Sequence, residues 1–145
     1  MRRWLTIWLA VLVIAPAMAW GQAPATDIGA ADRAQIRAVI GDQIAAFRRD
    51  DAAAAFGFAA PNIQAMFGSA ERFLGMVRDG YQAVYRPSDV AFGELVYIDD
   101  RLTQLVQVVG PDGAPRTALY FMERQADGAW RIAGCVLTTG QGTTA

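Results

Sequence analysis

The residues best suited to chemistry by type and spacing lie between positions 78 and 86 of the sequence. Two arginines, Arg78 and Arg86, flank two tyrosines, Tyr81 and Tyr85, in a segment that joins a predicted helix to a predicted strand. A guanidinium donates a planar fork of hydrogen bonds that suits a carboxylate or a phosphate, and tyrosine rings supply an apolar wall. The segment therefore indicates a site for a small, partly apolar ligand. Alternatively, the tyrosines anchor the core and Arg86 pairs with Asp89.

Two carboxylates flank the first predicted strand and are the acidic residues best placed to face the same pocket. With them, the predicted ligand-binding residues are Arg78, Tyr81, Tyr85, Arg86, Asp89 and Glu94. The set also allows a second hypothesis, a His-free enzyme of the isomerase, hydratase or cyclase type. A tyrosine and a carboxylate would then serve as acid and base, and Arg86 would stabilise developing negative charge. Because no set of acid, base and nucleophile is recognisable, we favour a non-enzymatic binding or envelope accessory module and predict no catalytic residue.

Composition narrows the chemistry further. The 145 residues include no His, and all 13 basic residues are Arg, against 14 acidic residues. Triads and metal sites built on His, Schiff-base lysines and phosphate-binding Walker lysines are thereby excluded. The net charge of -1 is not that of a typical nucleic-acid-binding protein, which needs a basic surface. We therefore predict no cofactor, no bound metal and no nucleic-acid partner.

Six of the 14 acidic residues occupy positions typical of helix caps and turns, where side-chain oxygens accept hydrogen bonds from nearby backbone amides. They are Asp50, Asp51, Asp99, Asp100, Asp112 and Asp127. Two pairs of adjacent aspartates are not predicted to hold a cation, because neighbouring side chains point apart and no third ligand follows at a metal-loop spacing.

The N-terminus has the pattern of an export signal. Arg2 and Arg3 precede an apolar run, and Ala17 and Ala19 are small residues at the positions that a signal peptidase reads. We expect cleavage after Ala19 and a periplasmic or secreted protein with no membrane contact after cleavage; an uncleaved anchor is the alternative. Residues 20 to 30 are predicted to be a linker, residues 31 to 140 a single domain and residues 141 to 145 a disordered tail.

The only cysteine, Cys135, lies in an apolar run of the last predicted strand. An intramolecular disulfide is impossible with one cysteine, so the core alone must stabilise the domain. We interpret Cys135 as a small buried apolar residue, with an intermolecular disulfide or a reactive thiol as the alternatives.

Helical periodicity dominates the first half of the domain. Asp32 and Gln35 resemble a capping box, and an apolar stripe beginning at Ile36 continues in a helix that is predicted to run to about Arg49. A short helix follows over residues 52 to 59, and Pro61 ends or redirects it. A third helix is predicted from Ser69 to Gly80. Residues 55 to 67 could form the wall or lid of a pocket, with Asn62 and Gln64 as donors, or a packed corner between helices.

Strand patterns dominate the second half. The runs are Val90 to Ile98, Arg101 to Val109, Arg116 to Arg124 and Ala129 to Thr138, separated by short turn sequences rich in Asp and Gly. Four strands joined in this way predict an antiparallel meander, and helices followed by strands predict an α+β domain with the helices on one face.

Both faces of the predicted sheet carry apolar residues. We assign Val106, Leu119, Phe121 and Val136 to one face, and Tyr120 and Cys135 to the other. Since one face covers the helices, the second would expose more apolar surface than a solvated sheet normally does. This predicts a homodimer through the outer face of the sheet.

Several motifs together resemble an uncharacterised exported bacterial family, domain of unknown function 4864, over roughly residues 32 to 140. They are Ala46-Phe47-x-x-Asp50-Asp51, Ala55-Phe56-x-Phe58-Ala59-Ala60-Pro61, Met76-Val77, Gly80-Tyr81, Tyr85-Arg86-Pro87 and Asp127-Gly128-x-Trp130-Arg131-Ile132-x-Gly134-Cys135. The order of elements is similar to the nuclear transport factor 2-like (SnoaL-like) superfamily. That similarity implies helices on a curved sheet in a cone that often encloses a pocket, but it implies no particular activity.

The volume enclosed by the cone separates a binding module from a purely structural dimer. A ligand pocket is expected to enclose roughly 300 Å³ or more, whereas Phe and Met side chains would fill the cone of a structural protein.

Overall fold

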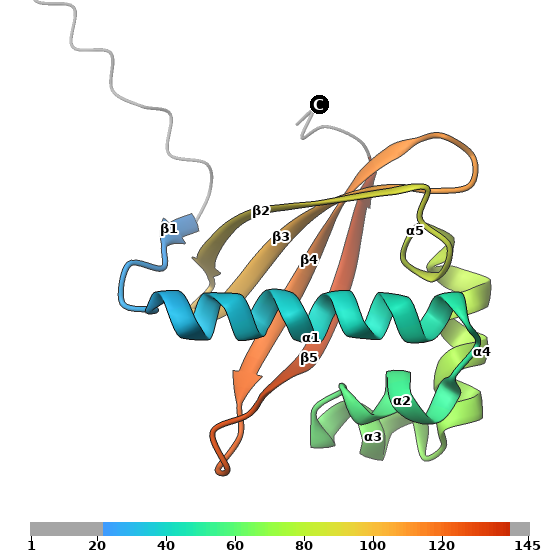
Figure 1. The fold of residues 1–145 in the computed structure, drawn as a ribbon, viewed down its shortest axis with the longest axis horizontal. Helices are drawn as coiled ribbons and strands as arrows, with labels where there is room; N and C mark the ends of the chain where they lie inside the picture. The colour runs from blue at the N-terminus through green and yellow to red at the C-terminus, as the bar shows by residue number, and fades with distance from the viewer. Residues whose placement is uncertain (1–21, 140–145) are drawn as a thin grey trace, which may run out of the picture.

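The computed structural model describes residues 22 to 139, which form five helices and five strands. The predicted signal peptide and the predicted tail lie outside the described residues. The helices are α1 (Ala30–Arg48), α2 (Ala52–Gly57), α3 (Pro61–Phe67), α4 (Ala70–Gly80) and α5 (Gln82–Tyr85), and the strands are β1 (Gln22–Pro24), β2 (Asp89–Ile98), β3 (Arg101–Val109), β4 (Pro115–Arg124) and β5 (Trp130–Thr139). The predicted α+β class is confirmed: α1 crosses one face of an open antiparallel sheet, and α2 to α5 gather at one end of it (Figure 1).

The sheet has the order β1-β2-β3-β4-β5, so the predicted count of four strands was wrong. The additional strand, β1, lies in the segment predicted as a linker and pairs with the end of β2, from Val96 to Ile98. β1 has only three residues and no alternation of apolar and polar side chains, so its sequence does not predict a strand. Its place in the sheet depends on backbone pairing with β2. The Arg33 side chain stabilises the following loop by donating to the carbonyls of Ala25 and Ile28.

The first helix begins earlier than predicted and without a capping box. Its N-cap is Gly29, which offers no side-chain cap, and Asp32 lies in the first turn. The Asp32 carboxylate instead accepts from the indole N–H of Trp130 at 3.1 Å and from Arg124 at 3.2 Å. The Asp32 carboxylate therefore binds tertiary partners on the β4–β5 hairpin and does not cap the helix.

The predicted apolar stripe of α1 is confirmed as the surface that packs on the sheet, with Ile36 and Ile40 fully buried. The middle of the chain contains more helix than predicted. Pro61 begins α3, since a proline at the first helical position lacks only an N–H that would be unpaired there. The short helix α5 was not predicted.

The four predicted strands are confirmed with ends that differ by at most one residue. Asp99 and Asp100 both adopt positive φ, +48° and +60°, which gives a tight two-residue hairpin between β2 and β3. The predicted assignment of faces was wrong for β4. Gln104 pairs with Tyr120, so Tyr120 faces the helices, and Leu119 faces away from them.

A bulge explains the error in the last strand. The β4–β5 register shifts where Phe121 pairs with Gly134 and Met122 with Ile132. The extra residue moves Cys135 onto the inner face, opposite Tyr120, whereas simple alternation from Ile132 would place Val136 there.

The outer face of the sheet carries Val136, whose side chain is 45% exposed. Phe121 on the same face is partly covered by the Arg101 guanidinium, which lies 3.8 Å from its ring centroid. A homodimer through this face stays a prediction.

If this face forms the dimer, Val136→Arg should convert a dimer to a monomer, because it places an unpaired charge in the interface. Light scattering after gel filtration gives the mass directly. Met66→Arg, at an exposed apolar residue outside the sheet, is the control and should leave the mass unchanged. A wild-type protein that is monomeric at high concentration would contradict the prediction.

Candidate functional site

An apolar pocket of about 230 Å³ lies between the helices and the inner face of the sheet. The lining residues are Gln43 and Phe47 from α1, Ala59 before α3, Ile63, Met66 and Phe67 from α3, Phe73, Met76 and Val77 from α4, Tyr81 and Val84 near α5, Tyr120 from β4, and Ile132, Gly134 and Cys135 from β5. None of them carries a formal charge at neutral pH. Phe and Met side chains thus narrow the space between helices and sheet without filling it.

Tyr120 provides the most unusual polar group of the pocket. The residue is 0% exposed, and its hydroxyl has no hydrogen-bond partner of normal geometry among the residues that the structure describes; the Cys135 thiol beside it is only a weak partner. Burial, and secondarily the neighbouring Cys135, raises the pKa of the phenol well above 10, so the group stays protonated. An unpaired buried hydroxyl costs about 1–3 kcal/mol. A polar atom placed in the pocket would remove this cost.

Cys135 lies directly opposite Tyr120 in the β4–β5 register and lines the same pocket. Burial raises the pKa of its thiol to about 12. The group is therefore neutral at physiological pH, which agrees with the interpretation of Cys135 as a small apolar residue.

Gln43 brings an amide to the pocket from the buried face of α1. The residue is 3% exposed, and its side chain donates to the Ala55 carbonyl at 3.1 Å. This bond joins α1 to α2 and leaves the amide oxygen as an acceptor beside the pocket.

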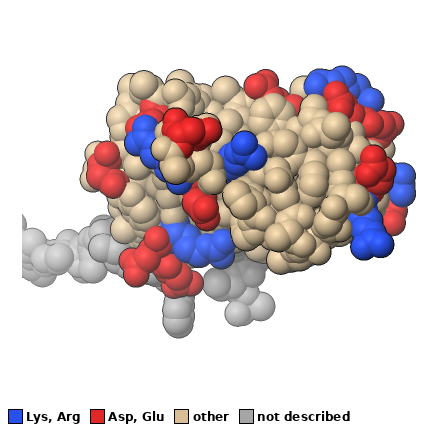
Figure 2. Space-filling view, turned by 90° about the horizontal axis from the view of Figure 1, so that it is seen from below, with Lys and Arg blue, Asp and Glu red and all other residues tan. Residues whose placement is uncertain are grey.

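Residues 55 to 67 form a wall of the pocket, one of the two interpretations of this segment. Asn62 and Gln64, the predicted donors to a ligand, bind backbone carbonyls of the protein. Asn62 donates to the Ala133 carbonyl, and Gln64 donates to the carbonyls of Phe56 and Ala59. The whole stretch from 52 to 70 contains no charged residue. Figure 2 shows a broad, largely uncharged surface at the end of the molecule where α2 and α3 lie, with charged side chains at its margins.

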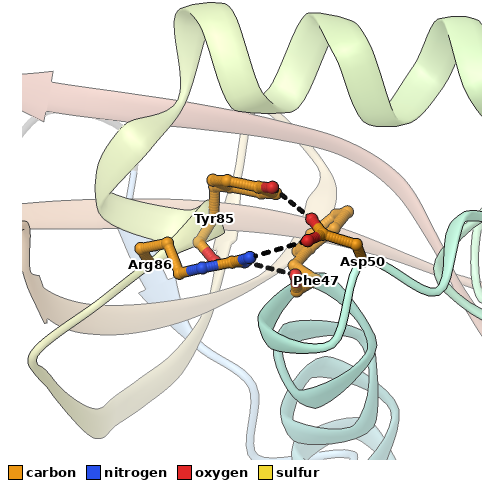
Figure 3. Close-up of polar contacts among 4 residues, drawn as sticks. All are labelled: Phe47, Asp50, Tyr85 and Arg86. Atoms are coloured by element: carbon orange, nitrogen blue, oxygen red, sulfur yellow. Dashed lines mark hydrogen bonds and ion pairs between the residues drawn. The ribbon is translucent and has the colours of Figure 1, made fainter.

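The predicted cluster of arginines and tyrosines is only partly assembled at the pocket. Tyr81 lines it. Tyr85 and Arg86 instead converge on Asp50, just after the end of α1 (Figure 3). The Tyr85 hydroxyl donates to one carboxylate oxygen, and Arg86 donates to the other at 3.1 Å. Arg86 also donates to the Phe47 carbonyl and lies 4.0 Å from the centroid of the Tyr85 ring.

We call Asp50, Tyr85 and Arg86 the Asp50 clamp. Asp50 has φ of +54°, which ends α1 and turns the chain toward α2. The Tyr85 hydrogen bond, and then Arg86, lower the pKa of the Asp50 carboxyl below its usual 3.8, and the same bond raises the pKa of Tyr85. Arg86 thus pairs with Asp50 and not with Asp89, the structural partner considered from the sequence.

The remaining three predicted site residues lie outside the pocket. Arg78 is exposed and pairs with its neighbour Asp79 at 3.4 Å. Asp89 and Glu94 are exposed residues of β2, and neither contributes to the lining. The pocket therefore brings together one of the six predicted residues with Tyr120, Gln43 and Cys135.

Sequence reasoning missed two of these polar groups for different reasons. Gln43 interrupts the apolar stripe of α1 between Ile40 and Ile44, and this polar residue on a buried face was a usable signal. Tyr120 gave no such signal, because its face depends on the register.

Among residues 22 to 139, no group of three or more acidic, His or Cys side chains is arranged to hold a metal ion. Within the same residues, no helix is long and apolar enough to cross a membrane.

The fold and the site define an α+β domain with an uncharged pocket between a helical layer and a five-stranded sheet. The family model described as Domain of unknown function (DUF4864) matches residues 29–145, so the chain belongs to this family. No curated protein and no solved structure matches the chain.

Asp50→Asn should lower the thermal unfolding temperature, since it weakens the contacts to Tyr85 and Arg86. The wild-type carboxylate stabilises the fold above its unfolded pKa of about 3.9, and this stabilisation is lost as pH falls through the lower folded value. Thermal unfolding between pH 7 and pH 2 should therefore show a smaller loss at acid pH for the variant. Asp99→Asn, at another residue of positive φ, is the control. Equal acid sensitivity of Asp50→Asn and wild type would contradict this role.

The Cys135 thiol should react very slowly in the native protein. At pH 8, a pKa of about 12 in place of 9 reduces the thiolate fraction roughly a thousandfold. Labelling with an aromatic disulfide reagent, followed by absorbance, should be slow in buffer and fast in denaturant. Rapid native labelling would instead support the reactive-thiol alternative.

Proposed function

We propose that this protein is an exported, non-enzymatic module that binds a small ligand in the pocket between its helices and the sheet. The observation that carries this proposal is the buried hydroxyl of Tyr120, a residue that lines a largely apolar cavity. Among the described residues this hydroxyl has no hydrogen-bond partner of normal geometry and has only the weak Cys135 thiol beside it. A protein selected only for stability has no use for an unpaired hydroxyl at such a position, because phenylalanine would fill the same space.

The size of the pocket restricts the ligands that it can admit. Its volume of about 230 Å³ is below the roughly 300 Å³ expected of a ligand site from the sequence. An engineered cavity of about 150 Å³ already admits benzene. The pocket therefore suits a ligand of one ring or a short chain.

The cone-like architecture of the nuclear transport factor 2-like superfamily and the periplasmic or secreted location belong to the same proposal. The order of helices and sheet, and the position of the pocket between them, support the first. The pattern of charged and apolar residues before Ala19 supports the second. The mass of the mature protein, which shows whether the chain is cleaved after Ala19, tests it.

The enzyme hypothesis receives no comparable support. It needs a carboxylate beside Tyr81 or Tyr85, and the pocket lining contains none. The carboxylate that Tyr85 contacts, Asp50, is engaged in the Asp50 clamp.

Toluene should bind to the wild-type pocket and shift the methyl NMR signals of two methionines that line it, Met66 and Met76. The signal of Met122, which is buried outside the lining, should not move and is an internal control. Cys135→Phe should abolish the shifts by filling the pocket.

Val136→Phe adds a ring at the adjacent position on the outer face and should leave toluene binding intact. Circular dichroism confirms that both variants fold. If wild-type Met66 and Met76 do not respond to saturating toluene, or if Cys135→Phe responds as the wild type does, the proposed function is wrong.

A further inference from the structure

We infer that the ligand is a neutral molecule of about one ring that carries a hydrogen-bond acceptor, and that this acceptor binds the hydroxyl of Tyr120. The inference rests on the proposed function and adds the chemical class of the ligand and the residue that selects it. Size, charge and hydrogen bonding support it separately.

The absence of formal charge in the lining disfavours an anionic ligand. Every described lining residue is apolar or neutral at physiological pH, including Tyr120 and Cys135, whose pKa values are raised. A carboxylate buried here would lose its hydration without gaining a cationic partner. Arg86, an arginine of the predicted site, is already paired with Asp50.

Hydrogen bonding favours a ligand that carries an acceptor over a purely apolar ligand. Tyr120 lies on the central part of β4 and is fully buried, and its O–H has no acceptor of normal hydrogen-bond geometry among the described residues. The nearby Cys135 sulfur is at best a weak acceptor. A ligand carbonyl or ether oxygen would accept this bond while the rest of the molecule contacts apolar walls.

The aromatic rings around the pocket favour a compact, flat ligand. Phe73 contacts Phe47, Phe56 and Phe67 with ring centroids 5.5–5.9 Å apart, so these rings support one another in a rigid wall. Met66 and Met76 complete the wall with side chains that adapt to shape.

Three probes with one benzene ring separate these features. Acetophenone is neutral and carries an acceptor, isopropylbenzene is its apolar isostere, and benzoate is an anion. Dissociation constants come from the methyl signals of Met66 and Met76 in wild type, Tyr120→Phe and Tyr97→Phe. The Tyr97 variant is the matched control, because it removes a tyrosine hydroxyl that lies outside the pocket lining and donates to Asp27.

Tyr120→Phe should weaken acetophenone binding roughly fivefold to tenfold and leave isopropylbenzene binding unchanged or slightly tighter. Tyr97→Phe should leave acetophenone binding within twofold of wild type. Benzoate should bind at least tenfold more weakly than acetophenone. The denaturation midpoint of unliganded Tyr120→Phe should equal or exceed that of wild type, because the substitution removes an unpaired buried hydroxyl.

The outcomes distinguish the two proposals. If none of the probes binds to the wild type, the proposed function itself fails. If isopropylbenzene binds but Tyr120→Phe does not weaken acetophenone, the pocket binds apolar molecules and the inference is wrong. Three other results would also overturn it: benzoate binding as tight as that of acetophenone, an equal loss of acetophenone binding in Tyr97→Phe, or a lower denaturation midpoint for Tyr120→Phe.

Discussion

The Asp50 clamp fixes the relation between the two halves of the domain, and the pocket depends on that relation. Asp50 follows α1, whereas Tyr85 and Arg86 lie 35 and 36 residues further along the chain, where the helices give way to the sheet. The Arg86 guanidinium does not line the pocket, because it donates to the Phe47 carbonyl and pairs with Asp50. The clamp thus holds the end of α1 beside α5, and the Phe47, Tyr81 and Val84 side chains line the pocket from these two elements.

On the opposite side, β5 and the segment around α3 are joined by their backbones. Ile132 exchanges hydrogen bonds with this segment, donating to Phe58 and accepting from Ala60, and the Asn62 side chain donates to the Ala133 carbonyl. The bulge in β5 follows immediately and turns Cys135 toward Tyr120. One short stretch of β5 therefore attaches the helical wall and also places Cys135 opposite Tyr120 in the pocket.

The sequence predicted individual elements better than their contacts. The strand ends were predicted to within one residue because alternating side chains and Asp- and Gly-containing turns are local signals. The face of Tyr120 was wrong because it depends on pairing with Gln104, a relation between strands that alternation alone leaves open. The partner of Arg86 was equally out of reach, since Asp50 is distant in sequence and had been interpreted only as the end of a helix.

The backbone link between β5 and the α3 segment has a further consequence for solubility. As the last strand in the order, β5 presents an edge at which another chain can add a strand, and the bonds of Ile132 to Phe58 and Ala60 occupy part of that edge. The α3 segment is also a wall of the pocket and is built from short helices, which have little stability of their own. Any opening of this wall would also expose the edge of the sheet, so the bonds of Ile132 to the α3 segment protect the protein against aggregation.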